Sequence, residues 1–228
     1  FVQYLDNNDN GYYTLMNIDA TQSSSTINLA NNTYQQSLKK TFTINGASLV
    51  NPSIYGKNDN NYDSYYLLDN AYFQGSNAEY FYPDGIFTQF KTSIFYGYNN
   101  MDCISTYLDL PPQNIVPFGP SITVTNNALT NFSFTSQGSP DYYCAVFQNA
   151  SINKYIQIFS PSTYHAFQFP DILKLTNLSN MTPADFKLSA LTMAKTPGFN
   201  ESKLLSYYNP SMFSQLSLAS QSATQYFQ

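Results

Sequence analysis

The feature that most restricts the fold of this chain is a series of short segments in which apolar and polar residues alternate. In the clearest of them, 86–98, one face would carry Ile86, Thr88, Phe90, Thr92 and Ile94. Similar segments span 40–44, 47–55, 121–125, 128–135, 142–148 and 154–159. A period of two is typical of strands with one buried face. About ten such strands, separated by turns, predict a mainly β chain folded as an Ig-like or jelly-roll-type β-sandwich.

The pattern changes on both sides of this β region. Asn45-Gly46 predicts a tight turn after which 47–55 returns. Beyond Pro170, Thr182-Pro183-Ala184-Asp185 has the form of a capping box and predicts a helix from Pro183 to about Lys195. A second short helix is expected at 199–208. We therefore expect an N-terminal extended tail at 1–22, a sandwich head at 23–175 and a helix-containing C-terminal region at 176–228 packed on the head.

The low charge content excludes several classes of function. Charged residues make up 10% of the chain, against roughly 25% in an ordinary soluble domain. Neither Arg nor Trp occurs, and the net charge of −5 argues against nucleic-acid binding. No apolar run of about 18 residues predicts a membrane span. Weak charge repulsion favours self-association, or solubility maintained by glycans.

The two cysteines indicate the cellular compartment. Cys103 and Cys144 lie 41 positions apart, and no basic residue stands close in sequence to activate either thiol. We predict a structural disulfide in an oxidising compartment, with two free buried thiols as the alternative. The chain begins with Phe1, which indicates either a removed signal peptide or a fragment. The expected location is extracellular or at the cell surface.

Six Asn-X-Ser/Thr sequons are consistent with that location. A chain this rich in Asn, Ser and Thr would contain about five by chance, so their weight depends on secretion. If the chain is secreted, several are expected to carry N-linked glycans, and no other cofactor is expected. The acceptors are Asn31, Asn131, Asn149, Asn177, Asn180 and Asn200.

Candidate chemical sites are few. Asp6, Asn8, Asn10 and the following Gly11 match the start of a calcium loop, but the closing acidic ligand is missing because the twelfth position is Asn17. A solvated turn is the alternative. His165 is the only histidine and lies in no nucleophile motif. No paired carboxylates, phosphate loop or dinucleotide fingerprint stands out, so we do not expect an enzyme.

The 21 tyrosines and 18 phenylalanines are the largest departure in composition. Most are explained as strand residues that fill a sandwich core while their hydroxyl groups reach water. Tyr is also enriched at protein–protein interfaces, and aromatic rings serve as platforms in carbohydrate-binding modules, which often use Trp. Composition alone leaves these uses open.

Two resemblances suggest an architecture and a function. Tyr142-Tyr143-Cys144-Ala145 resembles the end of strand F in immunoglobulin domains, where a Tyr two residues before the Cys forms a tyrosine corner. The Arg-free, sequon-bearing composition resembles the secreted thread-filament subunits of thermoacidophilic archaea.

The second resemblance implies a glycosylated extracellular filament whose subunits join by donor-strand addition, each inserting an N-terminal strand into the next. The implied partners are other copies of the chain. The strand would be 1–5 or 12–20, with Tyr12, Thr14, Met16, Ile18 and Ala20 at the subunit interface. The alternatives are a monomeric adhesin or glycan-binding surface domain, and a viral capsid subunit.

Overall fold

The structure is a computed structural model that describes residues 2–14, 21, 35–57, 65–119, 121–169, 171–175, 180–201 and 220–227. Most of these residues lie in antiparallel β-strands, which confirms the prediction of a mainly β chain. Two short 3-10 helices, η1 (Ile172–Leu175) and η2 (Pro183–Asp185), are the helical segments in these ranges. Neither of them is long enough to cross a membrane.

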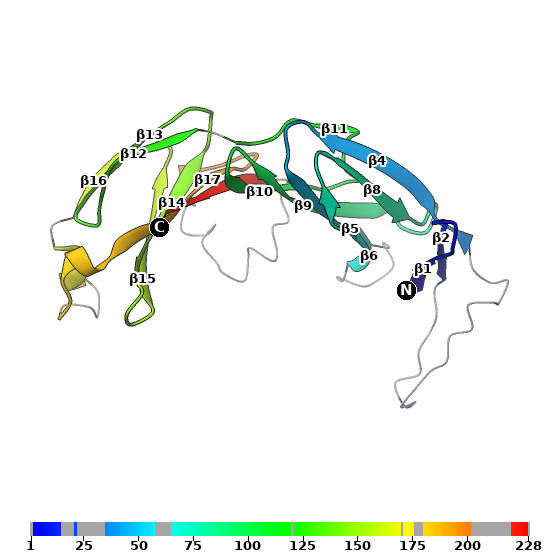
Figure 1. Ribbon diagram of the computed structural model, residues 1–228, viewed down its shortest axis with the longest axis horizontal. Helices are drawn as coiled ribbons and strands as arrows, with labels where there is room; N and C mark the ends of the chain where they lie inside the picture. Colours follow the sequence, from blue (N-terminus) through cyan, green and yellow to red (C-terminus); the bar gives the residue numbers. More distant parts are fainter. Residues whose placement is uncertain are drawn as a thin grey trace.

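One antiparallel sheet extends across the whole molecule, and we call it the main sheet. Its strands lie in the order β6, β5, β9, β10, β18, β17, β14 and β15, and β7 also pairs with β5. Figure 1 shows that the molecule forms an arch along this sheet. The bounds are β5 Leu49–Lys57, β6 Tyr66–Asn70, β7 Phe73–Gln74, β9 Gln89–Tyr98, β10 Met101–Tyr107, β14 Tyr142–Asn149, β15 Lys154–Pro161, β17 Lys187–Lys195 and β18 Ser220–Tyr226.

Two smaller groups of strands cover the convex side of the main sheet (Figure 1). The first group lies over the β5–β9–β10 half and consists of β4 (Leu38–Ile44), β8 (Asn77–Tyr82) and β11 (Asn114–Ile115). The second lies over the β14–β17 half and consists of β12 (Ile122–Ala128), β13 (Asn131–Ser136) and β16 (Ala166–Gln168). A single residue pair, Ala128 with Lys187, joins the second group to β17.

The covered side of the main sheet contains two separate apolar cores. The first includes Phe42, Tyr80 and Ile94 and lies under the β4–β8 group. The second lies under the β12–β13 group and includes Phe132 and Leu191. Each side chain of this size stabilises the fold by about 1.5–3 kcal/mol when fully buried. The chain therefore folds as two lobes, each with its own core, along one shared sheet.

The proline in β5 shows how the sequence is accommodated in the sheet. Side chains of β5 alternate between the first core and the opposite face, so that Val50 and Ile54 are fully buried. Pro52 has no N–H group for the ladder. It pairs with Ile94 of β9 on one side, and on the other side it falls in the gap between β7 and β6. The missing donor is therefore placed where β5 has no described neighbour.

The C-terminal strand joins the two lobes. β18 lies between β10 of the first lobe and β17 of the second, with antiparallel pairing on both sides. Its central Ala223 is fully buried in the first core, while Phe227 packs against the second. The C-terminal region is therefore not an addition packed on the head, as predicted, because β17 and β18 complete the main sheet.

The Asn45-Gly46 turn connects two layers of the fold. Gly46 has a φ of 82°, and the N–H of Ala47 donates to the carbonyl of Ile44, as expected for a tight turn. However, β4 pairs with β8 and β11, whereas β5 pairs with β6, β7 and β9. The turn position was predicted correctly, but the chain crosses from the covering layer into the main sheet and does not form a hairpin there.

The helix predicted from Pro183 to about Lys195 is wrong. The capping box forms, and the N–H of Thr182 donates to the Asp185 carboxylate at 3.3 Å, but η2 ends there and β17 follows. Leu188 and Leu191 are three positions apart, a spacing that is typical of a helix. In β17 both side chains enter the second core, because a β-bulge at Ser189 shifts the alternation by one residue. Pairing with β14 and β18 on both sides then favours the strand. The second predicted helix, 199–208, lies largely outside the described residues.

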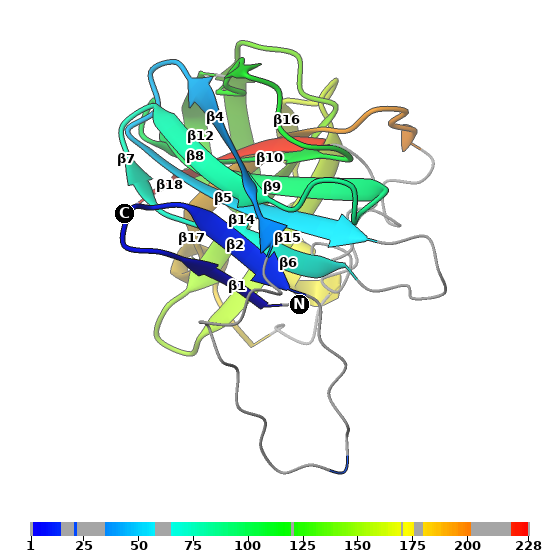
Figure 2. The ribbon, with the colours of Figure 1, turned by 90° about the vertical axis from the view of Figure 1, so that its right-hand side faces the viewer.

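The described N-terminal residues form a hairpin. β1 (Val2–Leu5) pairs with β2 (Gly11–Thr14), which pairs in turn with the two-residue β3 (Gln35–Gln36). Figure 2 shows β1 and β2 beside β6. Tyr13 is buried, and a Cβ on Gly11 would lie 2.5 Å from the Phe81 ring, so β2 packs closely against β8. Over 2–14 the N-terminus is therefore not the extended tail that we predicted.

Candidate functional site

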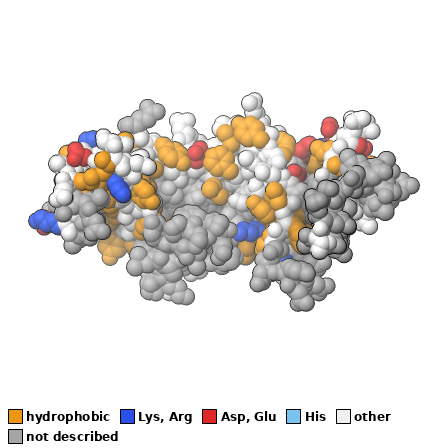
Figure 3. Space-filling model, turned by 90° about the horizontal axis from the view of Figure 1, so that it is seen from below, with side chains coloured by type: hydrophobic (Ala, Val, Ile, Leu, Met, Phe, Trp, Pro, Cys, Tyr) orange, Lys and Arg blue, Asp and Glu red, His pale blue; other side chains and the backbone are white. Residues whose placement is uncertain are grey.

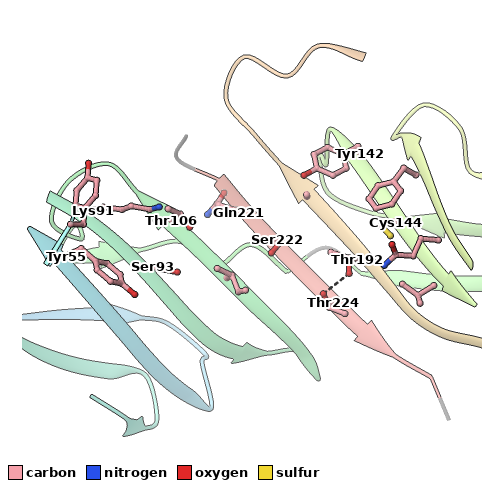
Figure 4. Close-up of a pocket in the computed structure, with 16 residues that line it drawn as sticks. Tyr55, Lys91, Ser93, Thr106, Tyr142, Cys144, Thr192, Gln221, Ser222 and Thr224 are labelled. Carbon is pink, nitrogen blue, oxygen red and sulfur yellow. Dashed lines mark hydrogen bonds between the residues drawn. The ribbon is translucent and has the colours of Figure 1, made fainter. Parts of the chain in front are cut away.

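The concave face of the main sheet, which none of the described strands covers, holds a cavity of about 580 Å³, which we call the concave cavity. Seven strands line it, from β5 at one end to β15 at the other, and Tyr65 in the segment before β6 adds to the wall. Figure 3 looks onto this face of the molecule, along which apolar side chains are spread. Figure 4 shows Tyr55 and Lys91 at one end of the cavity, β18 across its middle, and Tyr142 and Cys144 at the other end.

Strand alternation explains why these side chains meet. On β14, Tyr143, Ala145 and Phe147 enter the second core, so the residues between them, among which Cys144 is largely buried, face the cavity. β9 behaves in the same way, with Ile94 in the first core and Ser93 facing the cavity. Apart from Gln221 and Tyr65, the lining therefore consists of strand residues that alternate with the core positions, drawn from both lobes.

The lining is aromatic and rich in uncharged hydrogen-bonding groups. Three tyrosines lie near its ends, and hydroxyl or amide groups are spread between them. The hydroxyl groups of Thr192 and Thr224 hydrogen-bond to each other at 2.8 Å across β17 and β18. The uncharged polar residues of the lining are Ser93, Thr106, Gln157, Thr192, Gln221, Ser222 and Thr224.

The described part of the cavity lining carries little charge. Lys91 is the one ionisable Lys, Asp, Glu or His side chain among the described lining residues. Burial lowers the pKa of its ammonium group. Burial also raises the pKa of the Cys144 thiol to about 12, so this sulfur is a protonated thiol at neutral pH. The described lining thus provides no carboxyl pair for acid–base chemistry and no thiolate nucleophile.

The floor of the cavity is partly apolar. Ile104 on β10 is an exposed large apolar side chain, and Val146 on β14 and Phe159 on β15 also line the cavity. Exposed apolar groups inside a hollow, with polar groups placed around them, are typical of binding sites for small molecules and chain ligands. Rings and apolar groups would supply contact area, and the hydroxyl and amide groups would fix orientation.

The predicted disulfide between Cys103 and Cys144 does not form, and both cysteines are free and buried. Cys103 on β10 points into the first core, whereas Cys144 on β14 lines the cavity on the opposite face. β18 and β17 lie between the two strands, which separates the cysteines by about 14 Å across the sheet. A disulfide needs Cα atoms within about 7 Å, so the open alternative, two buried thiols, is the correct one.

The Asp6–Gly11 segment forms the turn of the β1–β2 hairpin. The Asp6 carboxylate accepts hydrogen bonds from the backbone N–H groups of Asn8 and Asn10 and from the Asn10 side-chain amide, at 2.8–3.0 Å. These bonds hold the pKa of Asp6 below its ordinary value, with the side chain of Asn10 as the largest cause. Its oxygens are engaged by donors of the turn itself, which favours the alternative of a solvated turn over a calcium loop. No group of three or more His, Cys, Asp or Glu side chains in the described ranges has the arrangement of a metal site.

The sequons differ in accessibility. Asn131, Asn180 and Asn200 are exposed, as a glycan requires. Asn149 is buried at the end of β14, and its side-chain oxygen accepts a hydrogen bond from the N–H of Ser151. Asn31 and Asn177 lie outside the described residues. None of the four described acceptors lines the concave cavity.

The predicted interface strand is only partly described. Tyr12 and Thr14 lie on β2 with partly exposed side chains, while Met16, Ile18 and Ala20 fall outside the described residues.

The exposed His165 lies beside the Phe134 ring at 5.4 Å, away from the concave cavity.

The concave cavity itself was not predicted. Its residues are spread from Tyr55 to Thr224, and they occupy the outward positions of strands whose core positions were easier to recognise. The available signal was the high Tyr, Ser and Thr content at these alternate positions. Comparison with protein-family models, curated proteins and solved structures finds no match to this chain.

Proposed function

We propose that the chain is an extracellular surface protein that binds a neutral, hydroxyl-rich ligand, namely a glycan chain, on its concave face. The observation that carries this proposal is the chemistry of the concave cavity, where tyrosines and apolar side chains adjoin many hydroxyl and amide groups and Lys91 is the one charged side chain of the described lining. We also propose that each lobe is an Ig-like or jelly-roll-type β-sandwich, since covering strands face the main sheet across each core.

Sugars match this lining in two ways. The C–H faces of a pyranose ring are apolar and stack on aromatic rings, as Tyr55, Tyr65 and Tyr142 would allow. The hydroxyl groups of a sugar both donate and accept hydrogen bonds, as do the Ser and Thr hydroxyl groups and the Gln amides of the cavity. A charged ligand would find one complementary ammonium group and would lose its hydration elsewhere.

The same lining favours binding over hydrolysis. Glycoside hydrolysis uses two carboxyl groups on either side of the scissile bond. Because the described lining residues contain none, the proposal assigns the cavity no catalytic step.

The proposal is tested by measuring affinity for neutral glycans on an array and by calorimetry. Tyr55→Ala and Tyr142→Ala should each weaken binding about tenfold, or about 1.4 kcal/mol, because each removes one ring face. Tyr164→Ala is the matched control, since Tyr164 is an exposed tyrosine outside the cavity. Wild-type protein that binds no neutral glycan, or a Tyr164→Ala variant that loses as much affinity as the cavity variants, would contradict the proposal.

A second candidate function is a structural subunit of an extracellular glycosylated filament assembled by β-strand addition between copies. A groove of about 560 Å³ between β1 and β6 favours it. Leu5 and Leu67 are exposed large apolar residues at its two sides, and β6 pairs with β5 alone among the described strands. Electron microscopy of native material separates this candidate from a closed capsid shell and from a monomeric adhesin.

A further inference from the structure

A second cavity of about 670 Å³ adjoins the concave cavity. We call it the Thr196 cavity. The two cavities share Thr106 of β10 and Gln221 of β18. The rings of Tyr142, which lines the first, and Phe199, which lines the second, are stacked at 5.5 Å with 21° between their planes. This stack stands where the two hollows meet, so one ligand can contact both.

Thr196 supplies a polar group that lacks a partner. Its side chain is 3% exposed and lines the second cavity, and its Oγ1 atom has no hydrogen-bond partner among the residues that the structure describes. Its backbone N–H is already used, because it donates to the Asp141 carboxylate at 2.6 Å. A buried hydroxyl without a partner is costly to the fold, so such groups are expected to serve a ligand or a structural water.

The two cavities differ in charge. The Thr196 cavity is lined by Asp141 and Lys195, whereas the concave cavity has Lys91 at its far end. The charged side chains of the Thr196 cavity can therefore form stronger hydrogen bonds with a ligand unit than the uncharged groups of the concave cavity can. The turn at Pro197-Gly198, where Gly198 has a φ of 71°, forms part of its wall.

We propose that the ligand is an oligosaccharide of two or more units that spans both cavities over the Tyr142–Phe199 stack. One unit lies on the concave cavity, and the next gives the Thr196 hydroxyl its hydrogen-bond partner. This inference rests on the proposed function, and it adds that recognition depends on chain length.

The test uses calorimetry with neutral glucose and mannose oligomers, from monomer to hexamer. Wild-type protein should gain at least tenfold in affinity between the monomer and the longer oligomers. Thr196→Val, which keeps the side-chain shape, should remove about fivefold to tenfold of that gain and leave monomer affinity unchanged. Thr163→Val is the matched control, because Thr163 is exposed and lines neither cavity.

The outcomes distinguish this inference from the function on which it rests. If the monomer binds as tightly as the hexamer and Thr196→Val changes neither affinity, the second cavity takes no ligand unit while glycan binding stands. If no oligomer binds the wild-type protein, both proposals fail. Thr196→Val should not lower the melting temperature, because it removes an unpartnered buried hydroxyl, so loss of binding cannot be attributed to unfolding.

Discussion

The buried tyrosine and cysteine residues determine how the protein responds to pH. Tyr80, Tyr143, Cys103 and Cys144 have pKa values raised to about 12, chiefly because burial disfavours their charged forms. In an unfolded chain the phenol groups would titrate near 10 and the thiols near 8.5. Burial also raises the pKa of the Asp69 carboxyl group. The described groups with raised pKa values therefore all hold protons more tightly in the folded state.

We predict that the free energy of unfolding falls between about pH 9 and pH 12. In this range the unfolded chain releases protons that the folded chain retains, so stability decreases as pH rises. By pH 12 each buried phenol contributes about 2 kcal/mol of loss and each buried thiol about 4 kcal/mol. Thermal melts across this range check the prediction. Tyr143→Phe should flatten the decline relative to Tyr164→Phe, which alters an exposed ring, and equal slopes in the two variants would contradict the assignment.

Asp69 acts with the same sign at low pH. At pH values just above the ordinary pKa of an Asp side chain, the folded state keeps a proton that the unfolded state has released. This carboxyl group therefore favours the folded state more as pH falls. Its Oδ2 atom also accepts a hydrogen bond from the N–H of Phe81 at 2.7 Å, which lowers the pKa by less than burial raises it. A buried, proton-retaining carboxyl group of this kind is consistent with tolerance of acidic surroundings.

At the scale of elements, β18 has the greatest effect on how the fold is joined. It contributes small side chains, and its backbone pairs with both β10 and β17. The cavity side of the strand presents Ser222 and Thr224, so the strand that links the lobes also forms the middle of the proposed binding face.

Ala223→Asp should destabilise the protein by about 4 kcal/mol. Ala223 is 0% exposed within the first core, so the substitution buries a charge without a partner and opens the contact between the lobes. Tyr226→Asp on the same strand is the control, because Tyr226 is 63% exposed, and it should cost less than about 1 kcal/mol. Chemical denaturation of both variants measures the difference. Similar values would mean that β18 is not held in the main sheet as described.

At the scale of the whole molecule, assembly into filaments can be separated from glycan binding by where the variants lie. The groove between β1 and β6 lies apart from the concave cavity, with which it shares no lining residue. A charged side chain on an edge strand prevents the addition of a further strand, because the charge would have to be buried between the two strands.

Leu67→Lys should abolish filaments seen by electron microscopy while leaving glycan affinity unchanged. Leu67 is an exposed residue of the edge strand β6, so the monomer should fold normally. Val116→Lys is the matched control, since Val116 is 81% exposed and lies outside the groove. Filaments that persist in the Leu67→Lys variant would show that β6 is not an assembly edge.

Several features of the fold follow from local patterns in the amino-acid sequence. Alternation in 86–98 and 142–148 predicted strands with one buried face, and β9 and β14 lie there because a period of two places alternate side chains in the core. Asn45-Gly46 predicted a turn because glycine adopts a positive φ at little cost. The scarcity of charge predicted a surface built from hydroxyl, amide and phenol groups.

The neighbours of each strand depend on contacts between segments that lie far apart in the chain. The tertiary structure turned the helix-like spacing of Leu188 and Leu191 into a bulged strand, because β14 and β18 pair with that segment on both sides. It placed Cys103 and Cys144 on opposite faces of one sheet, with two strands between them. It also assembled the concave cavity from residues between 55 and 224. Long-range backbone pairing sets these neighbours, and a local pattern specifies which face of a strand is buried but not which strand lies beside it.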